Sequence, residues 1–276
     1  MRFIDRQALD AQTSAKQPPW LLLIAVYLAA LRGPHAIWFV ALKAFPSSGV
    51  WLETHPAVVG IVWFSLHLLA AYVGVFVLLA KFRESFFGRS GFRARSVAGL
   101  VAISIVCSLP LSVFYAASFA KIVRGLTPLI AYASSPASEV REDALRHLAE
   151  VHVKVWTPLG WGTHTLGMIL ATLTSLIISP VYEQCFVVGA ALTRLARLLK
   201  LRFAIPAAAA LFVLTHLGLG GERFAANWHL FLLMALSAIA ARLWSGCWLA
   251  GALTHAIVNS MIFLPKWWFA FAIDYV

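Results

Sequence analysis

Residues 97–120 read VAGLVAISIVCSLPLSVFYAASFA and contain no Lys, Arg, Asp or Glu. About 20 apolar residues form a helix long enough to cross the roughly 30 Å hydrocarbon core of a bilayer. A helix also satisfies its own backbone hydrogen bonds inside that core, where water is not available to do so. This stretch therefore predicts a transmembrane helix, and the fold class depends on how often the pattern recurs.

Stretches of this kind recur along the whole chain. Further segments without Lys, Arg, Asp or Glu are 56–80, 157–182, 203–221, 224–241 and 243–265, and an apolar span interrupted by Arg32 covers about 19–42. Loops are expected between the spans, among them a loop at 242–245. Charged residues make up 12% of the 276-residue chain, compared with about 25% in soluble domains. We therefore expect an all-α fold, a polytopic bundle of seven or eight transmembrane helices in the lipid bilayer.

The net charge of +11 does not indicate a nucleic-acid partner, because the basic residues gather in short segments between the apolar ones. Segment 81–95 carries five Lys or Arg residues and segment 194–202 carries four. Basic loops tend to face the cytoplasm. Arg2, Arg6 and Lys16 precede the first span, so the N-terminus is also expected to be cytoplasmic. The abundance of Ala, Leu, Arg and Trp favours a bacterial inner membrane protein.

The chain divides into two predicted parts. Residues 1–156 are expected to form N-terminal transmembrane helices followed by an amphipathic surface segment at 121–156, in which the stretch 134–156 has Glu and Asp early and basic residues later. Residues 157–276 are expected to form a compact helical core. Proline disrupts the helix before it, so two topologies stay open around Pro180: two full spans, or one broken element. Only the broken element places the basic segment 194–202 in the cytoplasm.

Four polar side chains stand out in the apolar segments of this core: Glu183, His216, His255 and Asn259. Glu183 is the only acidic residue in 151–221. His255 and Asn259 are about one helical turn apart and therefore point the same way. At about 1.5 Å of rise per residue, Glu183, His216 and His255 lie roughly 15–20 Å from the basic segments near 194, 202 and 242–245, respectively. With the broken element at Pro180, the spacing predicts that the three share one depth near the middle of the membrane.

These residue types supply the parts needed to hydrolyse an amide. A carboxylate is a suitable general base, and a neighbouring histidine can hold the attacking water. A second histidine and a carboxamide can donate hydrogen bonds to the oxygen that gains negative charge. One such donor contributes on the order of 3 kcal/mol in known enzymes. Taken singly, each residue has a simpler explanation, since polar side chains also hydrogen-bond between membrane helices or relay protons.

The chain resembles the intramembrane CAAX protease and bacteriocin-processing family (CPBP, or Abi), which carries the motifs E-E-x-x-x-R, F-x-x-x-H and H-x-x-x-N in this order. The corresponding segments are EQCFVV at 183–188, FVLTH at 212–216 and HAIVN at 255–259, and the resemblance covers about 175–262. The last two motifs are intact. In the first, Gln184 replaces the second Glu and Val188 replaces the Arg. Replacing both members of an ion pair together leaves no unpaired charge buried.

The resemblance implies a glutamate-dependent intramembrane endopeptidase. In such an enzyme Glu183 and His216 activate a water molecule, while His255 and Asn259 stabilise the oxyanion. Gln184 and Phe212 have supporting positions.

No cofactor is expected. Zinc is the alternative, because Glu183, His216 and His255 offer three ligands and leave one position open. However, the sequence has no H-E-x-x-H helix. The three cysteines are spaced for neither a metal nor a redox motif, and we expect them to be small buried side chains: Cys107, Cys185 and Cys247.

Three functions stay open. The first is cleavage of a membrane-tethered or membrane-proximal peptide or protein, such as a prenylated C-terminus, a bacteriocin leader or a sorting tail. The altered first motif favours a second, a catalytically impaired relative that acts as a scaffold or immunity protein. The third is a transporter or proton relay that uses Glu183 and the histidines, although the sequence has no internal repeat of the kind that many transporters show. The sequence does not indicate an oligomeric state.

Overall fold

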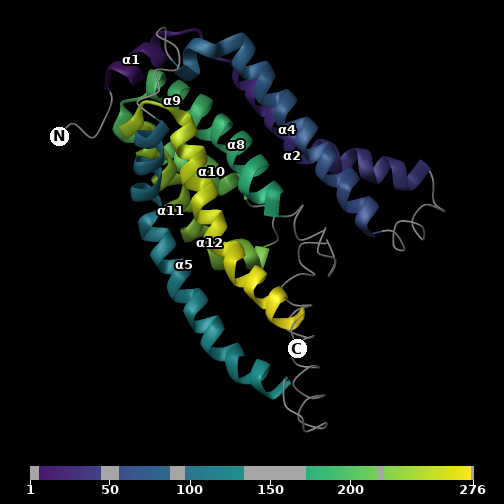
Figure 1. Cartoon of the computed structure of the whole chain (residues 1–276). Coiled ribbons are helices and arrows are strands. Elements are labelled where there is room, and N and C mark those ends of the chain that lie inside the picture. Colours follow the sequence, from purple (N-terminus) through teal and green to yellow (C-terminus); the bar gives the residue numbers. More distant parts are fainter. Residues whose placement is uncertain (1–5, 45–55, 88–96, 134–171, 217–220, 275–276) are drawn as a thin grey trace.

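The structure, a computed structural model, describes residues 6–44, 56–87, 97–133, 172–216 and 221–274 (Figure 1). Its elements are α1 (Arg6–Ser14), α2 (Trp20–Ala44), α4 (Pro56–Phe87), α5 (Val97–Ala133), η2 (Thr174–Ile178), α8 (Ser179–Gln184), η3 (Cys185–Ala191), α9 (Leu192–Leu198), α10 (Leu201–Thr215), α11 (Gly221–Ser245) and α12 (Trp248–Asp274). Here η2 and η3 are π-helical turns. These ranges contain no strand, which confirms the all-α fold class.

Four helices in the described ranges are long and apolar enough to cross a membrane: Ser65–Glu84, Val97–Ala117, Thr174–Leu198 and Asn227–Ser245. Trp20–Ala29 and Leu201–Thr215 are shorter apolar helices. The chain is therefore an integral membrane protein built as a helical bundle. The predicted number of seven or eight spans stays a prediction, because several of those spans extend into residues outside the described ranges.

Thr174–Leu198 is the central helix of the bundle. Of its most apolar window, 72% is buried, compared with 22–44% for the other three candidate spans. α12 packs against this central helix and against α5 and α11. Figure 1 shows α2 and α4 running as a pair along one side, with α5 on the other. The central helix carries Glu183, so the fold places this carboxylate inside the protein.

The central helix does not break at Pro180. The backbone stays helical from Thr172 to Leu198, so of the two topologies left open for this region, the one with two full spans that meet at Pro180 is excluded. The π-turn η2 precedes the proline, and its last hydrogen bond runs from the Ser179 N–H to the Thr174 carbonyl. This wider turn accommodates a residue without an N–H, so the helix passes through the proline.

α5 continues without interruption from the predicted span at 97–120 to Ala133. The first part of the segment 121–156 therefore extends this helix. The rest of that segment lies outside the described residues, and its surface location stays a prediction.

Small residues allow the helices to approach closely beneath the site, as is common between membrane helices. A Cβ atom built on Gly251 of α12 would lie 3.0 Å from the Ala238 carbonyl oxygen of α11 and 3.3 Å from a Val188 methyl of η3. A Cβ atom on Gly189 would lie 2.6 Å from the buried ring of Phe86. These contacts fix the spacing between the central helix and its neighbours.

The charge pattern predicted that Arg242 lies in a loop, and this prediction is wrong. It belongs to α11 and is 1% exposed. Its guanidinium donates to the Gly189 carbonyl at 3.1 Å, to Oε1 of Gln12 at 2.7 Å and to the Thr193 hydroxyl. Gln12 belongs to α1, so this network ties the N-terminal helix to the end of the bundle. A buried guanidinium is tolerated here because it is hydrogen-bonded.

Candidate active site

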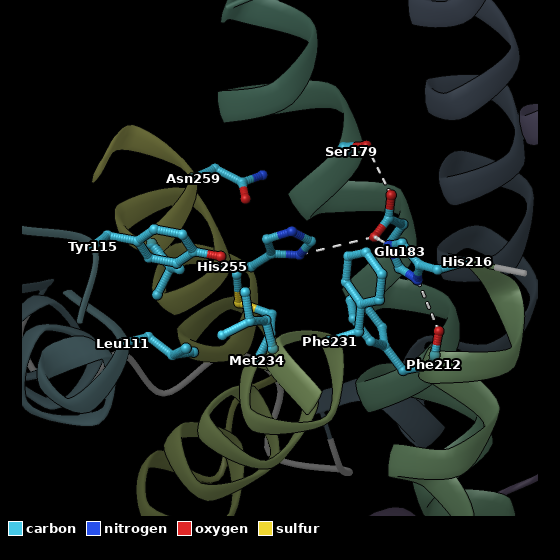
Figure 2. A pocket seen from close by; sticks show the side chains of 12 residues that line it. Leu111, Tyr115, Ser179, Glu183, Phe212, His216, Phe231, Met234, His255 and Asn259 are labelled. Carbon is cyan, nitrogen blue, oxygen red and sulfur yellow. Dashed lines mark hydrogen bonds and ion pairs between the residues drawn. The ribbon is translucent and has the colours of Figure 1, made fainter. Parts of the chain in front are cut away.

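A cavity of about 140 Å³ lies among five helices and contains the predicted site residues (Figure 2). Its polar wall consists of Ser179, Glu183, His216, His255 and Asn259. Its apolar wall comes from α5, α10, α11 and α12, with Leu111, Phe212, Leu230, Phe231, Met234 and Val258. Tyr115 of α5 completes the lining. Water-sized molecules therefore have room beside the acid.

Glu183 directs one carboxylate oxygen into this space. The Ser179 hydroxyl, one turn earlier on the same helix, donates to Oε1 at 2.8 Å. Oε2 is buried and accepts no hydrogen bond from any described residue. It lies 3.9 Å from Nε2 of His216 and 4.0 Å from Nδ1 of His255. Gaps of this length are suited to a bridging water.

His216 is held at the C-terminal end of α10 with a defined protonation pattern. Its Nδ1 lies 2.9 Å from the Phe212 carbonyl oxygen. Because a carbonyl only accepts hydrogen bonds, Nδ1 must carry the proton, and Nε2 of a neutral ring is then an acceptor. The ring stacks on Phe231 with centroids 4.3 Å apart. A neutral His216 therefore presents a lone pair toward Glu183.

Phe212 contacts both histidines. Its carbonyl accepts from His216, and its ring centroid lies 4.6 Å from that of His216 and 5.8 Å from that of His255. The supporting position implied for Phe212 thus has a physical basis in the contacts that orient the two imidazoles.

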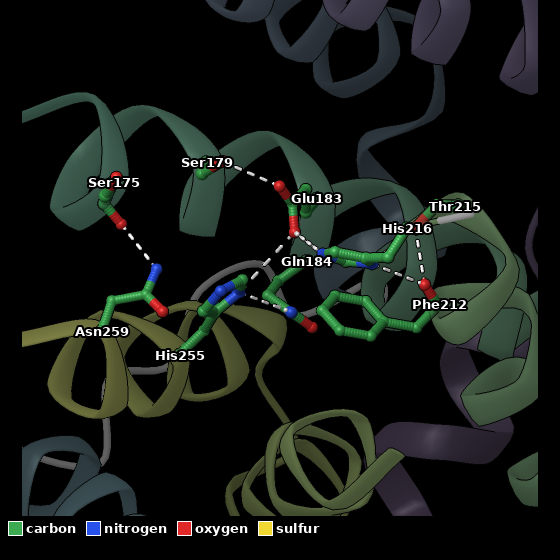
Figure 3. Close-up of polar contacts among 9 residues, drawn as sticks. All are labelled: Ser175, Ser179, Glu183, Gln184, Phe212, Thr215, His216, His255 and Asn259. Carbon is green, nitrogen blue, oxygen red and sulfur yellow. Dashed lines mark hydrogen bonds and ion pairs between the residues drawn. The ribbon is translucent and has the colours of Figure 1, made fainter. Parts of the chain in front are cut away.

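His255 lies on α12 and is 5% exposed. Its Nδ1 is 2.9 Å from the Nε2 atom of Gln184, which is itself fully buried. Figure 3 shows the imidazole between Asn259 and the Glu183–Gln184 pair, so residues from two helices meet at this ring.

Asn259 is fixed by the π-turn of the central helix. Its Nδ2 donates to the Ser175 carbonyl at 2.7 Å. In the π-helical pattern of η2, the N–H of Ser179 donates to the carbonyl of Thr174, five residues earlier. The same pattern would pair the Ser175 carbonyl with the N–H of residue 180, but proline has no N–H. The carbonyl is thus left for a side chain from α12. Since a carboxamide has two N–H groups, one N–H of Asn259, a residue that lines the cavity, is left without an acceptor among the described residues.

The structure brings together all four polar residues selected from the sequence. Sequence reasoning missed two further polar residues of the cavity, Ser179 and Tyr115. Ser179 was identifiable in principle, because it lies four residues before Glu183 and therefore on the same helix face. Tyr115 lies on a distant helix, and no sequence spacing connects it to the motifs.

The metal alternative can be tested against the ligand atoms. Among the described residues, no group of three His, Cys, Asp or Glu side chains is arranged to hold a metal ion. In addition, Nδ1 of His255, the nitrogen that faces Glu183, already has the Gln184 amide at hydrogen-bond distance. In this arrangement that nitrogen is hydrogen-bonded and not free to bind zinc, and the absence of a metal ion stays a prediction.

Comparison with known proteins gives one match. Residues 165–261 match the family model described as type II CAAX prenyl endopeptidase, Rce1-like. The chain matches no curated protein and no solved structure. The matched range contains the polar wall of the cavity and nearly coincides with the range of 175–262 drawn from the three motifs.

Proposed function

We propose that the chain is an intramembrane endopeptidase with Glu183 as its general base, because residues 165–261 match the family model of Rce1-like CAAX prenyl endopeptidases. The observation that carries this proposal is the position of Glu183 Oε2. This oxygen is buried and faces the cavity within 4.0 Å of two imidazoles.

Water activation follows from the two acceptors on one side of the cavity. A water molecule between Glu183 Oε2 and His216 Nε2 donates one hydrogen to each of them, because both atoms present lone pairs. Its own lone pair is then free to attack the carbonyl carbon of the scissile bond. Glu183 accepts the proton as the new carbon–oxygen bond forms, and the Ser179 hydroxyl holds the other carboxylate oxygen in place.

Charge stabilisation falls to His255 and Asn259. The carbonyl oxygen of the substrate becomes negatively charged when water adds, and N–H groups aimed at it lower the barrier. Asn259, which has one N–H left without a described acceptor, and His255 both line the cavity. When the carbon–nitrogen bond breaks, Glu183 returns its proton to the leaving nitrogen, so that water is added across the peptide bond without a net change in the enzyme.

The mechanism uses no metal ion and no other cofactor. The substrate is a membrane-tethered or membrane-proximal peptide or protein, because the cavity lies among apolar helices. A bacterial inner membrane with a cytoplasmic N-terminus is the setting that the basic segments favour.

Cleavage in proteoliposomes tests this function. The purified full chain is incubated with peptides that carry a prenylated C-terminus, a leader sequence or an apolar sorting tail, and the products are identified by mass spectrometry. We expect cleavage of at least one class, and we expect its loss in His216→Ala with the thermal midpoint retained. Equal cleavage by the natural chain and by His216→Ala would refute the proposal.

The altered first motif supports a second candidate, a catalytically impaired relative that serves as a scaffold or immunity protein. Val188, at the position of the motif's arginine, is fully buried against apolar neighbours. The double variant Gln184→Glu with Val188→Arg separates the two functions. Activity gained only in the double variant identifies a pseudoenzyme, whereas activity of the natural chain identifies a protease.

A further inference from the structure

The contact between Gln184 and His255 fixes more than the position of the ring. Gln184 Nε2 lies 2.9 Å from Nδ1 of His255, and the two side chains are 0% and 5% exposed. The amide nitrogen of glutamine donates hydrogen bonds and does not accept them. Nδ1 must therefore be the acceptor, with its lone pair directed at the amide.

This donor decides where the proton of the imidazole resides. A neutral imidazole carries one N–H, so a ring that accepts at Nδ1 is protonated on Nε2. We propose that Gln184 is a positioning residue that holds His255 as the neutral tautomer protonated on Nε2, ready to donate to the oxyanion. The tautomer follows from the contact alone, while its use by an oxyanion rests on the proposed function.

Two other side chains, Glu183 and Phe212, lie near this part of the His255 ring, and neither outweighs the amide. Glu183 Oε2 is an acceptor and would favour a proton on Nδ1, but it is 4.0 Å away, beyond hydrogen-bond distance. The same oxygen lies 3.9 Å from His216 Nε2. A water molecule that bridges these two atoms can donate a hydrogen bond to the carboxylate oxygen. Phe212 presents its ring to His255 edge-on and exchanges no proton.

The replacement of glutamate by glutamine in the first motif thus has a chemical consequence. A carboxylate at position 184 would only accept hydrogen bonds and would draw the proton to Nδ1, leaving a neutral ring with a bare Nε2. It would also place a second negative charge beside Glu183, and Val188 offers no cation to neutralise it. In this chain the amide gives the protonation pattern that an oxyanion donor needs.

Nitrogen NMR of the full chain tests the tautomer directly. The protein is labelled with ¹⁵N-histidine in lipid nanodiscs, and the His255 signals are assigned by their loss in His255→Gln. We expect Nδ1 to resonate as an unprotonated ring nitrogen and Nε2 as a protonated one. A protonated Nδ1 in the natural chain overturns the proposal, whatever the activity.

Variants separate positioning from general structural effects. Gln184→Glu is isosteric and is expected to move the proton to Nδ1, and Gln184→Met is expected to give a mixture of both tautomers. Gln17→Met removes another buried glutamine amide outside the cavity, so the His255 signals should be unchanged. Unchanged signals in both Gln184 variants would show that this residue does not set the tautomer.

The activity measurement is independent of the spectra. With an oxyanion donor lost, kcat of Gln184→Glu should fall on the order of 10²–10³-fold, with a much smaller change in KM. If Nε2 is protonated but no substrate is cleaved, the proposed function fails and the tautomer assignment stands. If cleavage occurs with Nδ1 protonated, the assignment fails and the protease function stands.

Discussion

Asn259 is predicted to have two separable effects, one on stability and one on catalysis. Asn259→Leu keeps the branching of the side chain but removes both N–H groups, so the Ser175 carbonyl loses the donor that lies at 2.7 Å. An unsatisfied buried carbonyl costs about 1–3 kcal/mol. Loss of an oxyanion donor lowers kcat on the order of 10²–10³-fold. We expect both losses in the single variant.

Pro180→Ala offers a way to separate these effects. It restores a backbone N–H to the residue that faces the Ser175 carbonyl in the π-turn register. The helix can then satisfy that carbonyl itself, so Asn259→Leu should cost less stability in the Pro180→Ala background. Catalysis should stay impaired, because the new N–H lies in the backbone of the helix and not in the cavity.

A double-mutant cycle measures this coupling. Thermal midpoints of the four proteins are compared in one detergent, together with their rates of peptide cleavage. About 1 kcal/mol corresponds to roughly 2–4 °C for chains of about this size, so a coupling of 1–2 kcal/mol is measurable. Additive stability losses would refute the role assigned to the π-turn, and recovery of cleavage along with stability would refute the oxyanion role of Asn259.

Three further variants or treatments probe the scaffold and the chemistry. Gly189→Ala places a Cβ against the buried ring of Phe86 and should lower the free energy of unfolding by about 1–3 kcal/mol; an unchanged thermal midpoint would contradict the packing. Arg242→Ala removes the link to Gln12 and should cost about 1.5–3 kcal/mol and expose α1 to added protease; equal protease resistance would contradict that link. A chelator should leave peptide cleavage unaffected, whereas inactivation that zinc reverses would restore the metal alternative.

The apolar segments and the three motifs were sufficient to predict the helical membrane bundle and the residues around the cavity. Long apolar stretches without charged residues are a strong signal for transmembrane helices, because a helix satisfies its own backbone hydrogen bonds inside the bilayer. Residue type and helical spacing also placed His255 and Asn259 on one face. These predictions depend on local periodicity, which the sequence carries directly.

Other features depend on hydrogen-bond registers or on distant contacts that no local pattern records. The expected break at Pro180 was wrong, since a π-turn supplies the space that the proline needs. Arg242 was expected in a loop because the sequence does not show that Gln12, 230 positions earlier, meets its guanidinium. The contact of Gln184 with His255 spans 71 positions and likewise arises only in the folded chain.

The central claim, that Glu183 activates water for peptide hydrolysis, is tested most directly by Glu183→Gln in a single-turnover cleavage assay. The amide can still accept from Ser179 and nearly preserves the shape of the side chain, but it is not a base. We predict that the cleavage rate falls on the order of 10²–10⁴-fold while the thermal midpoint stays close to that of the natural chain. A Glu183→Gln protein that cleaves within a few-fold of the natural rate would contradict the claim.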